Sequence, residues 1–227
     1  MWKSWDKLPE NMKTDAVLPY YEALRRHRAG LIVKRIADIL LSSVLIVVLS
    51  PVLLVIAVLI KIDSPGPVFY RQVRVTRYNK DFRIFKFRTM IVNADEKGAL
   101  VTTSNDSRIT RVGSKLRKYR LDEFPQLFNV FKGEMSLVGT RPEVRKYVDE
   151  YTDEMMATLL LPAGVTSEAS IAFKDEDRIL AEAEDVDKAY IEEVLPEKMA
   201  FNLDGVRYFS LRREFGLLFK TVIAVAR

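Results

Sequence analysis

The segment from Ile36 to Ile60 contains one charged residue, Asp38, and consists mostly of Leu, Ile, Val and Ala. An α-helix rises about 1.5 Å per residue, so a helix over this segment would reach roughly 37 Å. The hydrocarbon core of a bilayer is about 30 Å thick. A cleaved signal peptide begins earlier in the chain and has a shorter apolar region. The segment therefore predicts a membrane helix that persists in the working protein.

Basic residues flank this segment on both sides, with Lys34-Arg35 before it and Lys61 after it. A spanning helix usually has its Lys/Arg excess on one side only. Ser50-Pro51 supplies a turning point, because proline removes a backbone donor and a serine hydroxyl can satisfy a freed carbonyl. A kinked spanning helix stays an alternative. The paired flanks favour a re-entrant helix over residues 34–62, broken at Ser50-Pro51.

The rest of the chain divides at turn-forming residues and at changes of charge. Residues 1–33 are predicted to form a basic amino-terminal arm, and the turn cluster Asp63–Pro67 begins a soluble domain over residues 63–204. Residues 205–227 alternate aromatic and aliphatic residues with Arg and Lys, which predicts a basic amphipathic helix. The same pattern would suit a helix packed on the core, but the membrane segment favours a position on the membrane surface.

The soluble part has the pattern of a helical domain with little sheet. Short β-branched and aromatic runs predict a hairpin around Tyr78-Asn79, with strands Val68–Tyr70 and Phe82–Phe87. Apolar residues three and four apart predict helices over Ile109–Tyr119, Phe124–Lys132, Arg141–Leu160 and Ala181–Asn202. The predicted fold class is α+β and mostly helical: a re-entrant membrane helix, a small helical domain with a short β-hairpin, and surface amphipathic helices.

Composition limits the chemistry. The 36 Lys and Arg exceed the 31 Asp and Glu, and the resulting charge of +5 attracts phosphates, nucleic acid or anionic lipid without distinguishing them. The absence of Cys excludes disulfides and cysteine-based metal or nucleophile chemistry. The single histidine, His27, lies among arginines, and the sequence offers it no orienting partner. Carboxylates and cations are left as the candidate functional groups.

The most useful groups for chemistry lie around Leu121–Gln126. In one interpretation Asp122 caps a helix whose first turn contains Glu123 and Pro125, and capping carboxylates greatly outnumber catalytic ones. In another interpretation the carboxylates are functional, because nearby cations keep a carboxylate ionised. The cations within this stretch are Arg108, Arg111, Lys115, Arg117, Lys118, Arg120 and Arg141.

The functional interpretation has a definite chemistry. A helix amino terminus binds phosphate, so one site could hold a diphosphate, a metal ion and a carboxylate nucleophile together. Adjacent Asp and Glu residues can divide the work, one attacking phosphorus and the other holding Mg²⁺. Phosphoryl transfer needs charge neutralisation and positioning more than acid/base groups. The pattern therefore indicates phosphoryl transfer.

At these residues the sequence resembles a family, the bacterial sugar transferases or monotopic phosphoglycosyl transferases. The resemblance covers most of the chain, and so many motifs in one order make coincidence implausible. The motifs are Lys34-Arg35, Ser50-Pro51, Ser64–Pro67, Lys86–Met90, Asp106–Arg111, Leu121–Gln126, Gly133–Gly139 and Arg141-Pro142.

The resemblance implies a role for individual residues. Asp122 is expected to form a phosphosugar-enzyme intermediate, and Glu123 to support Mg²⁺, the expected cofactor. Substrate-binding residues are expected to be Arg141, Lys86, Arg88 and Arg108. The apolar helix is expected to be re-entrant and broken at Ser50 and Pro51. Residues 63–204 would then be the catalytic domain, on the cytoplasmic face of the bacterial cytoplasmic (inner) membrane.

The resemblance also implies a reaction. A UDP-sugar would be the donor, UMP would leave, and a polyprenyl phosphate, usually undecaprenyl phosphate, would accept the phosphosugar. The product would be a polyprenyl diphosphate sugar, made in the first membrane step of glycoconjugate biosynthesis. The expected partners are these two substrates and membrane lipid, without nucleic acid. Neither the sugar, nor the pathway, nor the oligomeric state follows from the sequence.

The sequence departs from the family pattern in three places. Thr140 stands where a Pro-Arg-Pro element commonly begins, Thr76-Arg77 replaces an expected Gly, and Leu161–Ser170 differs from the commoner Gly-Ile-Thr-Gly form. The chain also lacks the long multi-helix amino-terminal extension of larger members, as expected of a minimal form. The departures at Thr140 and Thr76-Arg77 predict slightly shifted donor contacts, and the difference in Leu161–Ser170 means that family membership does not give the sugar.

Two other classes of function compete with the enzyme. A non-catalytic adaptor would bind anionic lipid through its basic helices, and Asp122 would only cap a helix. A nucleic-acid binder would use the positive charge together with the 12 Phe and 9 Tyr as stacking platforms. The apolar segment argues against the nucleic-acid binder.

Overall fold

The computed structural model describes residues 2–94, 106–173 and 185–226. Labels α and β mark helices and strands, and η marks single 3-10 turns, except that η7 is a π-helical turn. The elements are η1 Trp5–Lys7, η2 Glu10–Met12, α1 Leu18–Arg26, α2 Arg28–Asp63, β1 Phe69–Thr76, η3 Arg77–Asn79, β2 Lys80–Phe87, α3 Arg111–Lys118, η5 Leu121–Glu123, α4 Gln126–Lys132, β3 Met135–Val138, α5 Arg145–Val148, η6 Met155–Leu160, β4 Ala163–Thr166, α6 Glu168–Ala172, α8 Val186–Ala189, η7 Tyr190–Val194, α9 Leu195–Arg207 and α10 Leu211–Ala226.

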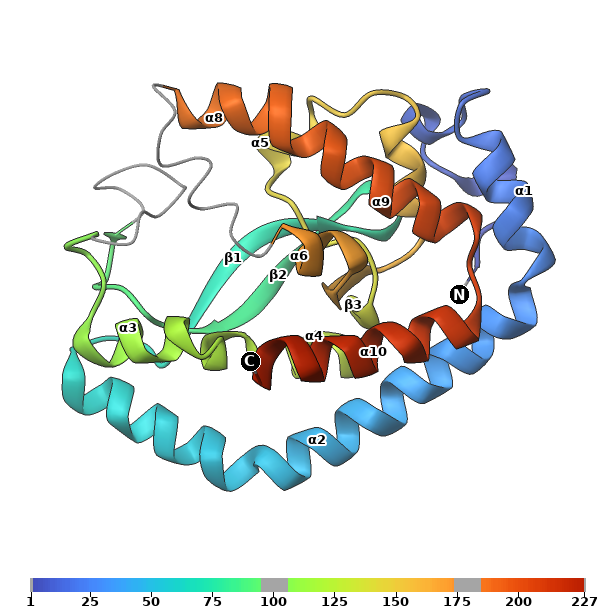
Figure 1. The fold of residues 1–227 in the computed structure, drawn as a ribbon. Coiled ribbons are helices and arrows are strands. Elements are labelled where there is room, and N and C mark those ends of the chain that lie inside the picture. The colour runs from blue at the N-terminus through green and yellow to red at the C-terminus, as the bar shows by residue number, and fades with distance from the viewer. Residues whose placement is uncertain (1, 95–105, 174–184, 227) are drawn as a thin grey trace.

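The apolar segment forms most of α2, a helix of 36 residues. It is long and apolar enough to cross a membrane, and no other helix in the described residues is. Figure 1 shows α2 along one side of the molecule, bent so that both ends rise toward the rest of the chain. The helix continues through Pro51, and the Ser50 hydroxyl donates to Val47 O at 2.7 Å. The helix is therefore not interrupted at Ser50-Pro51, contrary to the prediction of a break there. A proline inside a helix is nevertheless a known cause of bending.

Buried polar contacts fix the amino-terminal part of α2 to the domain. Asp38 accepts from Ser136 Oγ at 2.8 Å and from Leu137 N at 3.0 Å, both in β3. Lys34 donates to Val138 O at 2.8 Å and pairs with Glu214 of α10. A buried carboxylate with two donors is stabilised in place, whereas one without partners would be costly. The single acidic residue of the apolar segment, together with Lys34, thus attaches α2 to β3.

The predicted hairpin is confirmed, and it is longer than predicted. Strands β1 and β2 pair antiparallel from Phe69↔Phe87 to Thr76↔Lys80. Tyr78 and Asn79 form the turn with positive φ values of 61° and 55°. A second, two-stranded parallel sheet of β3 and β4 was missed, because its four-residue strands are too short for an alternating pattern to be visible.

Several predicted boundaries need correction. The single helix predicted over Arg141–Leu160 is wrong, since only α5 and η6 form there. The reason is that Glu143 O accepts from Val75 N of β1 at 2.9 Å, so this backbone pairs with the sheet instead of continuing a helix. The helix predicted from Ala181 begins outside the described residues, and helical turns run from Val186 to Arg207.

The amino-terminal segment is not a free arm. Residues of η1, η2 and α1 join the largest hydrophobic cluster, where Met12, Val17 and Leu24 are fully buried. Burying such side chains is worth about 1.5–3 kcal/mol each. The predicted arm is therefore part of the folded domain.

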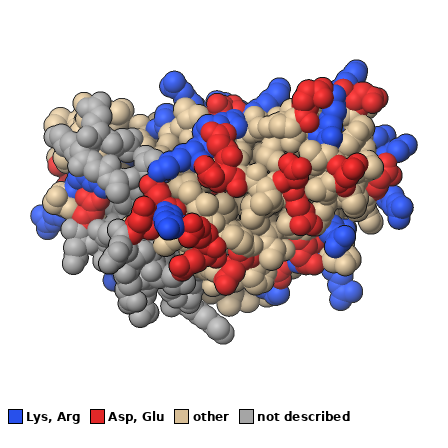
Figure 2. All heavy atoms as spheres, turned by 90° about the horizontal axis from the view of Figure 1, so that it is seen from above, with Lys and Arg blue, Asp and Glu red and all other residues tan. Residues whose placement is uncertain are grey.

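The molecule has two unlike sides. Phe215, Phe219 and Ile223 of α10 are exposed, and so are most apolar residues of α2. Figure 1 shows α10 beside α2, while Figure 2, which views the molecule from the side opposite α2, shows charged side chains of both signs spread among other residues. An exposed apolar face of this size is typical of contact with a membrane or a partner.

Arg88, predicted to bind substrate, is instead buried at the carboxyl end of α2. Its Nη1 donates to Pro65 O at 2.5 Å, and its Nη2 donates to Ser64 O at 2.7 Å and Ile60 O at 3.5 Å. Gly66 makes room for it, because a Cβ there would lie 2.0 Å from Arg88 Nη1. Ile60 O also accepts from Ser64 N at 3.2 Å, whereas the Ser64 and Pro65 carbonyls lie beyond the helix, where Arg88 supplies donors to them.

We predict that Arg88→Gln lowers the melting temperature of the detergent-solubilised protein by about 5–10 °C, because a buried charged donor to several carbonyls is lost. The exposed Arg83→Gln in β2, just before Arg88, is the matched control and should melt like the wild type. A substrate-binding role would give the opposite result, with an unchanged melting temperature and a raised KM.

Candidate active site

One face of the β1–β2 hairpin forms the floor of the site. Side chains alternate between the two faces of a strand. The register sets Tyr70 opposite Lys86 and Arg74 opposite Phe82, so Tyr70, Arg74 and Lys86 share a face. Sequence analysis identified Lys86 only. The signal for Tyr70 and Arg74 was their even, four-residue spacing in β1, which places them on one face of the strand but becomes informative only when the register is known.

The Asp-Glu pair lies in η5, between α3 and α4. Arg120 precedes it with a positive φ of 52°, which reverses the chain after α3. Helix α4 begins at Gln126, its capping position is Pro125, and no side-chain capping bond is made there. The interpretation of Asp122 as the cap of this helix is therefore wrong. The Asp122 carboxylate does not cap α4.

Glu123 is the centre of a partly buried ion cluster. Arg141 Nη2 donates to Glu123 Oε1 at 2.7 Å and Arg141 Nη1 to Oε2 at 3.4 Å, while Lys86 Nζ lies 3.2 Å from Oε1. Burial by itself would raise the pKa of Glu123, but Arg141 and Lys86 outweigh it and hold the pKa well below its usual value. Burial in turn lowers the pKa of Lys86, opposed by Glu123. Glu123 is therefore ionised throughout the neutral range.

Asp122 has a different electrostatic environment from its neighbour. Burial raises its pKa above the usual 3.8, Glu123 raises it further, and Lys86 and Arg117 oppose the shift. Arg117 is held by Thr89, whose Oγ1 accepts from Arg117 Nε at 3.1 Å. A desolvated carboxylate is a stronger nucleophile than a hydrated one, provided that nearby cations keep it charged. Arg117, not predicted as a site residue, is therefore added to the candidate site.

The structure brings together four of the six residues predicted for chemistry or substrate binding: Asp122, Glu123, Lys86 and Arg141. Arg88 is at the end of α2, as described above. Arg108 forms a salt bridge with Asp106 at 2.5 Å and donates to Ala94 O at 2.8 Å. Its hydrogen bonds lower the pKa of Asp106 to about 2. Arg108 therefore links Ala94 with Asp106 before α3.

The described residues contain no group of three or more His, Cys, Asp and Glu side chains that could enclose a metal ion. Mg²⁺ commonly binds through one or two carboxylates, with waters and substrate phosphates as its other ligands. Two groups suit this kind of Mg²⁺ binding. They are Glu123 Oε2, whose contact with Arg141 is the longer one, and the adjacent Asp122 carboxylate. These residues therefore fit a Mg²⁺ ion shared with a bound diphosphate, and they do not form an all-protein site.

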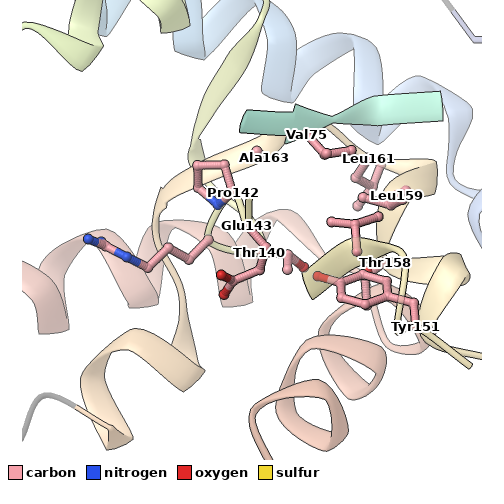
Figure 3. A pocket seen from close by; sticks show the side chains of 11 residues that line it. Val75, Thr140, Pro142, Glu143, Tyr151, Thr158, Leu159, Leu161 and Ala163 are labelled. Atoms are coloured by element: carbon pink, nitrogen blue, oxygen red, sulfur yellow. The ribbon is translucent and has the colours of Figure 1, made fainter. Parts of the chain in front are cut away.

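A small cavity of about 10 Å³ lies behind Arg141. Figure 3 shows Thr140, Pro142 and Glu143 along one wall and Tyr151, Thr158 and Leu159 along another. This volume is about that of one water molecule and far below a sugar nucleotide. The cavity is therefore too small to hold a sugar nucleotide.

Comparison with known proteins places the chain in a family. The family described as bacterial sugar transferase matches residues 29–227. A UDP-N-acetylgalactosamine-undecaprenyl-phosphate N-acetylgalactosaminephosphotransferase of Aeromonas hydrophila is 40% identical over 84% of this chain and 43% of its own length. UDP-glucose:undecaprenyl-phosphate glucose-1-phosphate transferases of Klebsiella pneumoniae and Caulobacter vibrioides are 34% and 33% identical, over 85% and 83% of this chain and 40% and 68% of theirs. The chain thus spans about two fifths of the length of the first two relatives. On the extent of these matches, the chain belongs to the bacterial sugar transferase family.

Proposed function

We propose that the protein transfers a sugar 1-phosphate from a UDP-sugar to polyprenyl phosphate, in particular undecaprenyl phosphate, and releases UMP. The observation that carries the proposal is the Asp122-Glu123 pair beside Lys86, Arg117 and Arg141. This arrangement offers a carboxylate without a capping role and a set of cations suited to phosphates. The named activities of the relatives support the same reaction.

The proposed mechanism has two displacements at one phosphorus atom. An oxygen of the Asp122 carboxylate attacks the sugar-bearing phosphorus of the donor, and the bond from this phosphorus to the bridging oxygen breaks. UMP leaves with that oxygen, and the sugar phosphate is held as an acyl phosphate on Asp122. A phosphate oxygen of polyprenyl phosphate then attacks the same phosphorus, the bond to Asp122 breaks, and the carboxylate is regenerated. The product is a polyprenyl diphosphate sugar, and no proton transfer is required.

The other residues position the donor and balance its charge. Lys86 and Arg141 would lie beside the donor diphosphate, and both are held in place by Glu123. Mg²⁺, held by Glu123 and the donor phosphates, would neutralise charge that develops on the leaving UMP. An arginine fork can bind two phosphate oxygens at once, which a lysine cannot. Arg141 is accordingly proposed as the principal donor contact.

A non-catalytic lipid-binding adaptor is the alternative. The adaptor needs exposed cations over lipid, whereas Lys86 and Glu123 have side-chain exposures of only 19% and 14% and are paired. Burying such charges costs free energy, and lipid binding would not recover it. The buried ion cluster therefore favours the enzyme.

The first prediction concerns the nucleophile. Wild-type protein given donor alone should release UMP and gain the mass of one phosphosugar, measured by intact-protein mass spectrometry. Asp122→Asn should do neither and should lose at least about a thousandfold in turnover, because an amide does not attack phosphorus. Its melting temperature should stay close to that of wild type, since Asp122 caps no helix. Normal turnover by Asp122→Asn would rule out the covalent mechanism, and the exposed Asp153→Asn is the control.

The second prediction concerns the metal ion. EDTA should abolish UMP release, and added Mg²⁺ should restore it. Glu123→Gln should lower turnover by at least about a hundredfold, since both the metal ligand and the partner of two cations are lost. The apparent Mg²⁺ concentration for half-maximal activity should rise in the same variant. Full activity in EDTA would contradict a role for the metal.

The third prediction concerns topology, for which we propose a re-entrant α2 at the bacterial cytoplasmic membrane with the catalytic domain on the cytoplasmic face. Basic flanks at both ends and the bend of α2 support re-entry (Figure 1). Because the chain has no Cys, single cysteines at Arg28 and Asp63 should be labelled from the cytoplasmic side only. Pro51→Leu restores a backbone donor and should shift labelling toward opposite sides. Labelling of the unmodified helix from opposite sides would establish a spanning topology instead.

A further inference from the structure

The segment Thr140–Glu143, which carries Arg141, is held in place along its length by contacts from other parts of the chain. Gly164 N of β4 donates to Thr140 O at 2.8 Å, and Val75 N of β1 donates to Glu143 O at 2.9 Å. Arg74 Nη1 donates to Pro142 O at 3.2 Å. The backbone on both sides of Arg141 therefore has fixed partners, although the segment is neither helix nor strand.

The Glu143 side chain extends this support into the carboxyl-terminal helices. Tyr190, the first residue of the π-helical turn η7, donates its hydroxyl to Glu143 Oε1 at 2.6 Å. Lys198 of α9 donates to the Tyr190 hydroxyl at 3.0 Å and lies 3.6 Å from Glu143 Oε1. All three side chains are less than 8% exposed. A buried carboxylate with these partners has little freedom to move.

Two further features of the segment suit a rigid support. A Cβ on Gly164 would lie 2.2 Å from Gly139 N, so only glycine lets β3 and β4 approach this closely just before Arg141. Arg74, besides its bond to Pro142, is itself held by Gln72. Its Nε and Nη2 donate to Gln72 Oε1 at 3.0 Å and 2.7 Å. Both β1 and β4 are thereby fixed against the segment.

We propose that Glu143 is a positioning residue that acts through Arg141, and that Tyr190 and Lys198 hold Glu143 in the required place. The proposal rests on the function proposed above, in which the Arg141 fork contacts the donor phosphates. Arg141 reaches Glu123 with one contact of 2.7 Å and one of 3.4 Å, so a small shift of its backbone would break the weaker one. The π-helical turn serves to bring Tyr190 to Glu143, and such turns are frequent at functional sites.

The test uses Tyr190→Phe, which keeps the ring and removes the hydroxyl. The matched control is Tyr147→Phe, since the Tyr147 ring lies 4.5 Å from that of Tyr190 but its hydroxyl donates to Asp187. We expect Tyr190→Phe to lower kcat/KM for the UDP-sugar by about tenfold and Tyr147→Phe to lower it by less than about twofold. Glu143→Gln is the second variant, since it keeps an acceptor for Tyr190 and removes the charge beside Lys198.

The decisive comparison repeats Tyr190→Phe and Glu143→Gln in an Arg141→Lys background. If Glu143 and Tyr190 act through Arg141, each substitution should lower kcat/KM by less than about twofold in this background, because the arginine fork that they position is already absent. An equal loss in both backgrounds would assign Glu143 and Tyr190 to general stability, and no loss in the wild-type background would also overturn the proposal.

A readout independent of turnover completes the experiment. Hydrogen exchange of the Val75 amide, which donates to Glu143 O, should become faster in Tyr190→Phe and stay unchanged in Tyr147→Phe. Unchanged exchange at Val75 in Tyr190→Phe would overturn the proposal even if turnover fell. Failure of the wild-type protein to release UMP would refute the proposed function. Hydrogen exchange at Val75 would still report on the contacts of Glu143 with Tyr190 and Lys198.

Discussion

The ion cluster of Glu123 with Lys86 and Arg141 is the interaction on which the site depends. It joins three parts of the chain that are distant in sequence, namely β2, η5 and the segment after β3. A partly buried carboxylate between two cations is favourable only when all three are in place, because each would otherwise be desolvated without a partner. The cluster therefore specifies how the hairpin, the acidic turn and the Arg141 segment are arranged.

The same cluster explains why two adjacent carboxylates differ. Glu123 takes both close cation contacts, and its pKa falls, whereas Asp122 is buried beside a negative neighbour, and its pKa rises. Environments that push two pKa values apart often mark a division of roles. In the proposed reaction this division gives Glu123 the fixed charge that orients cations and metal, and Asp122 the more reactive carboxylate.

The strand β3 connects this site with the membrane-directed helix. Asp38 of α2 bonds the backbone and a hydroxyl of β3, and the chain reaches Arg141 three residues after that strand ends. Because these bonds are buried, the distance between the apolar surface of α2 and the ion cluster is fixed. This geometry suits the proposed acceptor, a lipid whose phosphate lies at the membrane surface.

The sequence by itself determined the apolar helix, the hairpin and the Asp-Glu pair with its cations, because their signals are local in periodicity, composition and motif. It could not separate Lys86, which joins Glu123, from Arg88 two residues later, which lies at the end of α2. Nor could it exclude a capping role for Asp122, single out Arg117 among the neighbouring cations, or find Tyr190 and Lys198. Those assignments depend on strand register, on where α4 begins, and on tertiary contacts such as that of Tyr190 with Glu143, 47 positions away. Only the tertiary structure decides them, since a side chain's partner is set by how the elements pack and a local pattern carries no record of that packing.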